Sequence, residues 1–283
     1  MRCNKAVQYA VKNIRLEVSK EISDDKICSL YNQLHSSRKV GEYFNISQPY
    51  VLKILKENNI KLVSNSKAHS KYSINENYFD TIDTLSKAYI LGFICADGCV
   101  TDRNELIVTV QDKDKPVVSF IQNELASTKP IRQIKRNQFI AWEFRPQNKA
   151  LVNRLKELQI LPRKSLILDI KKVILNSNLN DDQTRAFLLG YFDGDGGIYK
   201  CLVHEKYYQY SFSITGTFET CSYYKNYFDN IGFFTKRQKN NTNNYTYCVS
   251  GRNQVKKCLS KLYSIKEDLG FFFDRKYRIY SEL

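Results

Sequence analysis

A duplicated apolar segment constrains this chain more than any other feature. Residues 85–98 contain Ile-Leu-Gly-Phe-Ile-Cys-Ala-Asp-Gly, and residues 184–196 contain Leu-Leu-Gly-Tyr-Phe-Asp-Gly-Asp-Gly. Both copies are apolar nearly all round, as in a buried helix, and both end on an Asp-Gly pair. Because similar strands and helices follow each copy, the sequence predicts two related halves joined about a pseudo-twofold axis.

The segments after each copy follow one order. Alternating apolar residues predict strands, and helical spacing of apolar residues predicts helices. The predicted order in each half is αββαββα, so the fold class is α/β (α+β) with two pseudo-twofold repeats. The elements expected after the duplicated segment are 105–111, 116–125, 131–135, 139–145 and 149–158 in one half, and 207–215, 221–231, 233–239, 245–250 and 253–263 in the other.

Each duplicated segment carries a glycine in the middle of its helix. Gly92 and Gly190 occupy the same register, and a mid-helix glycine costs about 1 kcal/mol relative to alanine. One such glycine would need no special explanation. Two at matched positions favour a close crossing of two helix backbones.

Asp97 and Asp195 end these two helices. A carboxylate at a helix C-terminus is disfavoured by roughly 0.3–1 kcal/mol, and convergence of the two helices would add repulsion. A divalent cation with oxygen ligands, Mg²⁺ (or Mn²⁺), would relieve both, and such a site on a basic chain indicates phosphodiester hydrolysis. The alternative is that each aspartate only shapes an Asp-Gly turn. Two matched copies favour the metal site.

The net charge of the chain indicates which class of partner it binds. Its 283 residues include 44 Lys and Arg against 29 Asp and Glu, a formal net charge of +15. Such a surplus attracts polyanions, nucleic acid before an anionic membrane surface, although the codon bias of an AT-rich genome also enriches lysine. No apolar run approaches the roughly 20 residues of a membrane-spanning helix, so we expect no membrane partner.

The eight cysteines and three histidines show no metal-ligand spacing, so we expect no structural zinc. The absence of a secretory segment argues against a disulfide framework and predicts a soluble, intracellular protein with reduced thiols. Residues 1–20 are basic and weakly amphipathic, and their role stays open. The cytoplasm and an organelle (mitochondrion or plastid) both remain open as compartments.

Residues 21–63 have the pattern of a helix-turn-helix DNA-binding region. Three short helices are expected, at 24–34, 38–44 and 50–58, with a tight turn before the last. The alternative is an ordinary three-helix cap. Residues 64–77 are polar and predict a linker, followed by repeat 1 at 78–175 and repeat 2 at 176–283. The DNA-binding candidates at the exposed face of the third helix are Gln48, Tyr50, Lys53 and Lys56.

The duplicated motif resembles the two signature motifs of a monomeric LAGLIDADG homing endonuclease, over roughly residues 78–283. The resemblance implies that the motif helices form the central interface and that two four-stranded sheets form a saddle over the DNA major groove. It also implies that Asp97 and Asp195 bind Mg²⁺ with the backbone carbonyls of Ala96 and Gly194. Cleavage would be double-stranded, across the minor groove, with 3′ overhangs.

The family's other catalytic positions match less uniformly. Gln111 corresponds to a strand-end residue that orients water, whereas the second repeat has Thr215 there, which suggests asymmetric active sites. Lys164 and Lys276 correspond to a basic residue near the scissile phosphate, although generic phosphate attraction would explain them equally well. Cys95 replaces the family's usual acid at its motif position, which Asp193 keeps.

DNA contacts are expected from the outward faces of the sheets, where arginine can pair with guanine edges. The candidates are Arg132, Lys135, Arg136, Gln138, Arg145, Lys236, Arg237, Lys239 and Arg252.

The sequence therefore predicts a free-standing, monomeric, site-specific DNA endonuclease that depends on Mg²⁺ or Mn²⁺. One alternative is an RNA maturase that binds intron RNA and assists splicing. The other is a non-catalytic DNA-binding regulator, against which the presence of both motif aspartates counts. An intein setting is not expected, because the chain begins with Met1 and lacks a terminal His-Asn.

Overall fold

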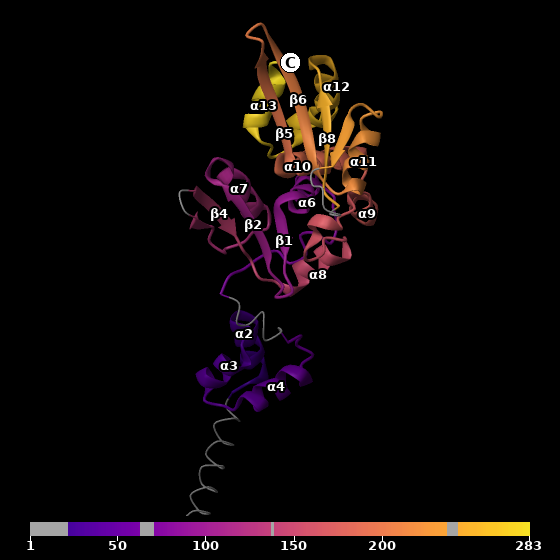
Figure 1. The fold of residues 1–283 in the computed structure, drawn as a ribbon. Coiled ribbons are helices and arrows are strands. Elements are labelled where there is room, and N and C mark those ends of the chain that lie inside the picture. The colour runs from indigo at the N-terminus through magenta and orange to yellow at the C-terminus, as the bar shows by residue number, and fades with distance from the viewer. Residues whose placement is uncertain (1–21, 63–70, 137–138, 237–242) are drawn as a thin grey trace, which may run out of the picture. The chain divides into compact units, whose positions relative to one another are not determined.

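The computed structural model describes residues 22–62, 71–136, 139–236 and 243–283 (Figure 1). The chain divides into two compact units, residues 1–71 and residues 72–283, each with its own hydrophobic core. Gln138, Arg237 and Lys239, three of the predicted DNA-binding residues, lie outside the described residues.

The first unit contains the three expected helices, α2 (Asp24–Leu34), α3 (Ser37–Phe44) and α4 (Gln48–Glu57). The side chains of Ser36 and Ser47 cap α3 and α4 by accepting backbone N–H bonds. Asn45 turns the chain between these helices in the left-handed conformation, with φ of 52°. A Cβ on Gly41 would lie 2.8 Å from the Ile46 carbonyl oxygen, so a glycine allows this turn to approach α3 closely.

The second unit repeats the order αββαββα twice, as predicted. Each repeat ends in further helical segments that the sequence pattern did not indicate. The first repeat consists of α6 (Leu85–Asp97), β1 (Gly98–Val100), β2 (Leu106–Gln111), α7 (Lys115–Glu124), β3 (Arg132–Arg136), β4 (Phe139–Phe144) and α8 (Lys149–Glu157), then η2 (Lys164–Leu166) and α9 (Ile170–Asn176). The second consists of α10 (Asp181–Asp195), β5 (Gly196–Val203), β6 (Tyr207–Gly216), α11 (Phe218–Tyr227), β7 (Phe233–Lys236), β8 (Tyr245–Ser250) and α12 (Arg252–Tyr263), then η3 (Lys266–Asp268) and α13 (Asp274–Ser281).

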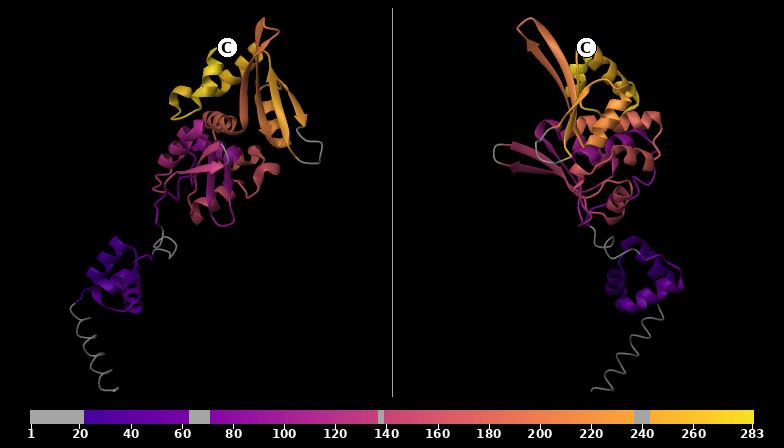
Figure 2. Two further views of the ribbon diagram at one scale, coloured as in Figure 1. Left: turned by 60° about the vertical axis from the view of Figure 1, so that its left-hand side comes forward. Right: turned by 45° about the vertical axis from the view of Figure 1, so that its right-hand side comes forward.

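Each repeat forms one four-stranded antiparallel sheet, in the orders β1-β2-β4-β3 and β5-β6-β8-β7. Alternate residues of the central strands are buried, for example Val108 opposite Phe144 and Phe212 opposite Val249. The helix α7 packs on the first sheet, and α11 and α12 pack on the second, so one face of each sheet is covered by helices (Figure 2). The other face carries the polar alternates and is the outward face.

The two motif helices α6 and α10 pack against each other between the two repeats (Figure 1). A Cβ on Gly92 would lie 1.9 Å from the carbonyl oxygen of Phe187, and a Cβ on Gly190 would lie 2.0 Å from that of Tyr89. No side chain fits at those distances. The prediction that both glycines permit a close backbone crossing is confirmed.

The linker is shorter than the predicted 64–77. The backbone N–H of Ser73 donates to Thr128 Oγ1 at 2.8 Å, and the N–H of Asn75 donates to the Leu125 carbonyl at 2.8 Å. These bonds fix the segment before repeat 1 onto the end of α7. Residues 72–77 therefore belong to the second unit, because their polar backbone finds partners there.

Two further features concern the described residues alone. Their cysteines (Cys28, Cys95, Cys99, Cys201, Cys221, Cys248 and Cys258) are free thiols. None of their helices has the length and apolar content needed to cross a membrane.

Candidate active site

The motif aspartates are the last residues of α6 and α10, and the helix crossing brings them together. Asp97 reaches solvent, but the protein around it removes hydration, and the nearby charge of Asp195 adds repulsion. These two effects raise the pKa of Asp97 to about 6, although Lys276 and Lys164 act in the opposite direction. The helix crossing thus places two carboxylates close enough for the charge of one to act on the pKa of the other.

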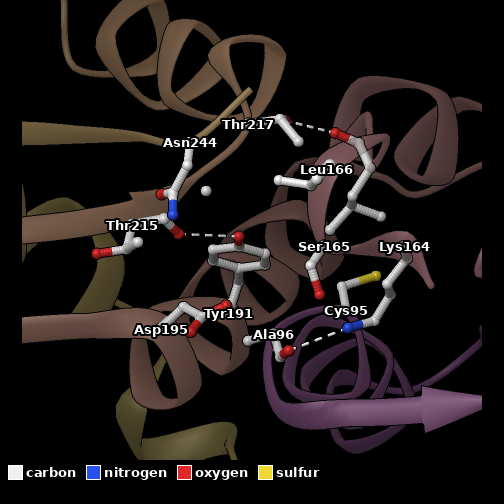
Figure 3. Close-up of a pocket in the computed structure, with 12 residues that line it drawn as sticks. Cys95, Ala96, Lys164, Ser165, Leu166, Tyr191, Asp195, Thr215, Thr217 and Asn244 are labelled. Atoms are coloured by element: carbon white, nitrogen blue, oxygen red, sulfur yellow. Dashed lines mark hydrogen bonds between the residues drawn. The ribbon is translucent and has the colours of Figure 1, made fainter. Parts of the chain in front are cut away.

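Two hollows flank this meeting point. One, of about 240 Å³, is lined by Asp195 together with Ala96, and we call it the Asp195 pocket (Figure 3). The other, of about 250 Å³, is lined by Asp97 together with Gly194, and we call it the Asp97 pocket. Each pocket therefore joins the aspartate of one repeat to the residue that precedes the aspartate of the other.

Gly194 is required where the helix ends meet. A Cβ at this position would lie 2.4 Å from the Cβ of Ala96 and 3.5 Å from the carboxyl carbon of Asp97. A larger residue would therefore push the ends of α6 and α10 apart. The four motif residues predicted as metal ligands occupy one small region of the molecule.

Lys164 borders the Asp195 pocket, as Figure 3 shows. Its Nζ donates to the Ala96 carbonyl at 3.0 Å, and burial to 6 % exposure lowers the pKa of its ammonium group. The buried Cys95 lines the same pocket, and burial raises the pKa of its thiol to about 12. Lys164 thus faces a neutral thiol, a carboxylate and a helix end.

Lys276, the matching lysine of the second repeat, is placed differently. Its Nζ donates to the carbonyls of Phe192, Asp193 (2.9 Å) and Gly196 (2.7 Å). The residue is 2 % exposed, and burial lowers the pKa of its ammonium group to about 8. Lys276 caps the C-terminal end of α10 and lines neither of the two pockets in the described structure.

Asp193 is buried at the position where the first repeat has Cys95. Its Oδ2 accepts from the hydroxyl of Tyr89 at 2.7 Å and from the backbone N–H of Phe273 at 2.9 Å. Burial raises the pKa of Asp193, and the charge of Lys276 opposes that effect. The hydrogen bond from Tyr89 to Asp193 therefore links the first repeat to the second beside the Asp97 pocket.

Gln111 is exposed at the end of β2, on the outward face, and lines the Asp97 pocket. Thr215 lines the Asp195 pocket, where its carbonyl accepts from the hydroxyl of Tyr191 at 3.0 Å. The two predicted strand-end positions therefore lie in opposite pockets, and their side chains differ.

Arg275 was not predicted from the sequence, yet it lines the Asp97 pocket. Its Nε and Nη2 donate to the two carboxylate oxygens of Asp114 at 2.8 and 3.0 Å, which connects the second repeat to the first. A signal was present in the sequence, because an Arg-Lys pair occurs at Arg163-Lys164 and again at Arg275-Lys276.

The strand registers show on which face of the first sheet each predicted DNA-binding residue lies. Arg132 pairs with Glu143 and lies on the outward face, as expected. Lys135 pairs with Ile140 and lies on the other, helix-covered side, because side chains alternate along a strand. Arg145 forms a bidentate ion pair with Glu105 at 2.8 and 3.0 Å. Arg136 ends β3.

Both described candidates of the second repeat lie away from its outward face. Lys236 pairs with Tyr245, on the same side as the buried Tyr247. Arg252 begins α12, donates to the Glu282 carbonyl at 2.9 Å and stacks over Tyr210. Strand alternation excludes Lys236 from the outward row, and the docking of α12 excludes Arg252.

The candidates of the first unit are mostly exposed on α4. Gln48 donates to the hydroxyl of Ser37 at 3.1 Å. Lys53 lies 3.7 Å from Glu57 in an exposed pair, and Lys56 is exposed. Tyr50 is only partly exposed, because its ring packs against the core of this unit.

No family model matches the sequence, and no curated protein matches it. Solved structures with a similar fold include I-SmaMI bound to an uncleaved DNA target in the presence of calcium ions, with 13% identity, 69% of this chain and 89% of that chain covered, and a TM-score of 0.48. The I-LtrWI LAGLIDADG homing endonuclease bound to target DNA has 14% identity, covers 74% and 90% of the chains, and has a TM-score of 0.47. LAGLIDADG homing endonuclease I-GzeII in complex with its DNA target has 11% identity, coverage of 69% and 87%, and a TM-score of 0.45. The solved structures similar to this chain thus include members of the family that its two sequence motifs resemble.

Proposed function

We propose that this protein is a LAGLIDADG homing endonuclease that cuts both strands of a specific DNA target with a divalent metal ion. The observation that supports this most strongly is the pair of pockets at the crossing of α6 and α10, each containing one motif aspartate. The +15 charge of the chain favours a polyanionic substrate.

The donor atoms of the two pockets fit Mg²⁺ or Mn²⁺. Each pocket brings one carboxylate, Asp97 or Asp195, to the backbone of Gly194 or Ala96, and hard oxygen ligands suit these ions. The described residues contain no group of three or more His, Cys, Asp or Glu side chains that could hold a metal. Phosphate and water would therefore supply the remaining ligands, as is common for Mg²⁺.

When bound, the ion would stabilise charge on the phosphate and lower the pKa of a water molecule. In the hydrolysis, water adds to phosphorus while one phosphorus–oxygen ester bond breaks. The water releases a proton to solvent, and the leaving oxygen takes one up. Gln111 lines the Asp97 pocket and would orient this water there, and Lys164 donates to the end of α6 beside the Asp195 pocket. In the proposed complex the outward faces of the sheets lie in the major groove.

A single chain suffices for this activity. The two repeats supply both pockets, and the crossing of α6 and α10 buries the faces that would otherwise join two copies. We therefore expect a monomer. The presence of both aspartates counts against a non-catalytic regulator, and no feature of the described fold favours intron RNA as the ligand.

The first unit would add DNA affinity through α3, its turn and α4, with Gln48, Lys53 and Lys56 exposed. Removal of residues 1–71 should weaken binding and flatten its dependence on salt, because phosphate contacts are lost. A salt slope equal to that of the full chain would contradict a DNA role for this unit.

The experiment that tests the function is cleavage of a randomised duplex library with Mg²⁺ and with EDTA, followed by sequencing of the ends. Breaks that need Mg²⁺ and share one long consensus are expected. Binding without breaks would contradict the nuclease, and RNA would then be the next ligand to examine.

A further inference from the structure

The Arg-Lys pair that follows the last helix of each repeat is used in two different ways. In the first repeat, Lys164 lines the Asp195 pocket, and Arg163 is not among the described residues that line it. In the second repeat, Arg275 lines the Asp97 pocket, and Lys276 does not. The two pockets thus take different members of the same pair, and the Asp97 pocket is also lined by Lys113, which belongs to no such pair.

Lys276 has no donor left for a substrate. A lysine ammonium group carries three N–H donors, and all three are directed at carbonyls at the end of α10. The side chain is also 2 % exposed. A phosphate could reach Lys276 only if this cap were broken and the C-terminal end of α10 lost its partner.

Arg275 has the donors and the access that Lys276 lacks. Its guanidinium group carries five N–H donors, and the pair with Asp114 uses two of them. Its side chain is 41 % exposed. Asp114 lies directly before α7 of the first repeat, and the Phe273 ring lies 4.8 Å from the guanidinium carbon, so both repeats hold the group in place.

We propose that Arg275 is the phosphate-binding residue of the Asp97 pocket, and that Lys276 acts as the cap of α10 instead. The inference rests on the proposed nuclease function. A guanidinium group can offer paired N–H donors to the non-bridging oxygens of a phosphate. Because Asp114 fixes its orientation, Arg275 would bind the phosphate with little loss of side-chain freedom.

The test is single-turnover cutting of a target duplex labelled on both strands, with the full-length protein. Arg275→Gln should slow one strand by about 10²-fold relative to the other, as expected on loss of one preorganised donor group. Arg275→Lys should restore part of that ratio, because it keeps the charge. Arg163→Gln is the matched control, and it should leave the ratio of the two strand rates unchanged.

Lys276→Met separates the two roles. Loss of the α10 cap should lower the melting temperature and slow both strands together, because α10 carries Asp195 for one pocket and Gly194 for the other. A Lys276→Met protein that melts normally but loses one strand would overturn the inference, as would an unchanged strand ratio in Arg275→Gln. A wild-type protein that cuts neither strand would instead overturn the proposed function, and this inference with it.

Discussion

The two repeats share their backbone plan but differ in the side chains of their pockets. Both have the same strand order, and both place a glycine against the backbone of the opposite motif helix. The Asp195 pocket contains Lys164 and Thr215, whereas the Asp97 pocket contains Gln111 and Arg275. The parts that hold the helix crossing are therefore alike, and the parts that would touch substrate are not. Two chemically distinct sites on one scaffold should act on the two strands at different rates.

The largest expected effect comes from the motif aspartates. Asp97→Asn or Asp195→Asn should reduce double-strand cleavage by about 10³-fold or more, because each removes a carboxylate that we propose as a metal ligand. DNA affinity should change little, since binding depends on many other contacts. Strand-resolved cleavage and a binding titration check both parts. Asp102→Asn, at an exposed turn, is the control and should cut normally.

Substitutions at the helix crossing should have the next largest effect, a loss of stability that is equal in the two repeats. Gly92→Ala and Gly190→Ala each place a methyl group about 2 Å from a backbone carbonyl oxygen, so each should lower the free energy of unfolding by about 3 kcal/mol. Gly270→Ala, whose added Cβ meets only side chains at 3.2 Å or more, is the control. Denaturant unfolding would contradict the shared crossing if only one glycine proved sensitive.

The outward face of the first sheet can be tested with Arg132, and Arg252 of the second repeat is the comparison. Arg132→Gln should weaken DNA binding about tenfold, because it removes a proposed DNA contact from the outward row. Arg252→Gln should change affinity less than twofold, since that side chain lies on the helix-covered side and bonds to the chain end. Equal losses in a titration at fixed salt would show that the outward face is assigned wrongly.

The smallest effect concerns the pH dependence of Asp97. Its pKa in the folded protein, about 6, is above its ordinary value of 3.8, so the folded state holds this proton more tightly than the unfolded state. Without divalent metal, wild-type stability should therefore fall relative to Asp97→Asn as pH rises from about 4 to about 6. Melting temperatures of the two proteins across this range measure it. Parallel curves would mean that folding does not raise the pKa of Asp97, through burial or through Asp195.

Much of this architecture was accessible from the sequence. The duplication identified α6, α10 and both aspartates, and apolar spacing gave the order of elements, because each depends on local pattern. Strand alternation could also have placed Lys236 with Phe234, on the helix-covered side. Three features escaped prediction because they depend on long-range geometry. They are the exchange of motif residues between the pockets, the Arg275–Asp114 pair, and the docking of α12, through Arg252, against the chain end.

The hydrogen-bond partners of the two matched lysines likewise could not be predicted from the sequence. Lys164 and Lys276 follow the same Arg-Lys pattern, but one begins the short η2 segment and the other lies within α13. The local backbone decides how many carbonyls each ammonium group can reach. A motif match therefore located both lysines near a helix end without showing which one borders a pocket.

The most direct test of the whole account is cleavage of the selected target by the Asp97→Asn, Asp195→Asn double variant beside wild type, with Mg²⁺ and with EDTA. The account predicts that wild type cuts both strands only with Mg²⁺ and that the double variant binds the same duplex but cuts neither strand. Cleavage by the double variant at the same positions would contradict it.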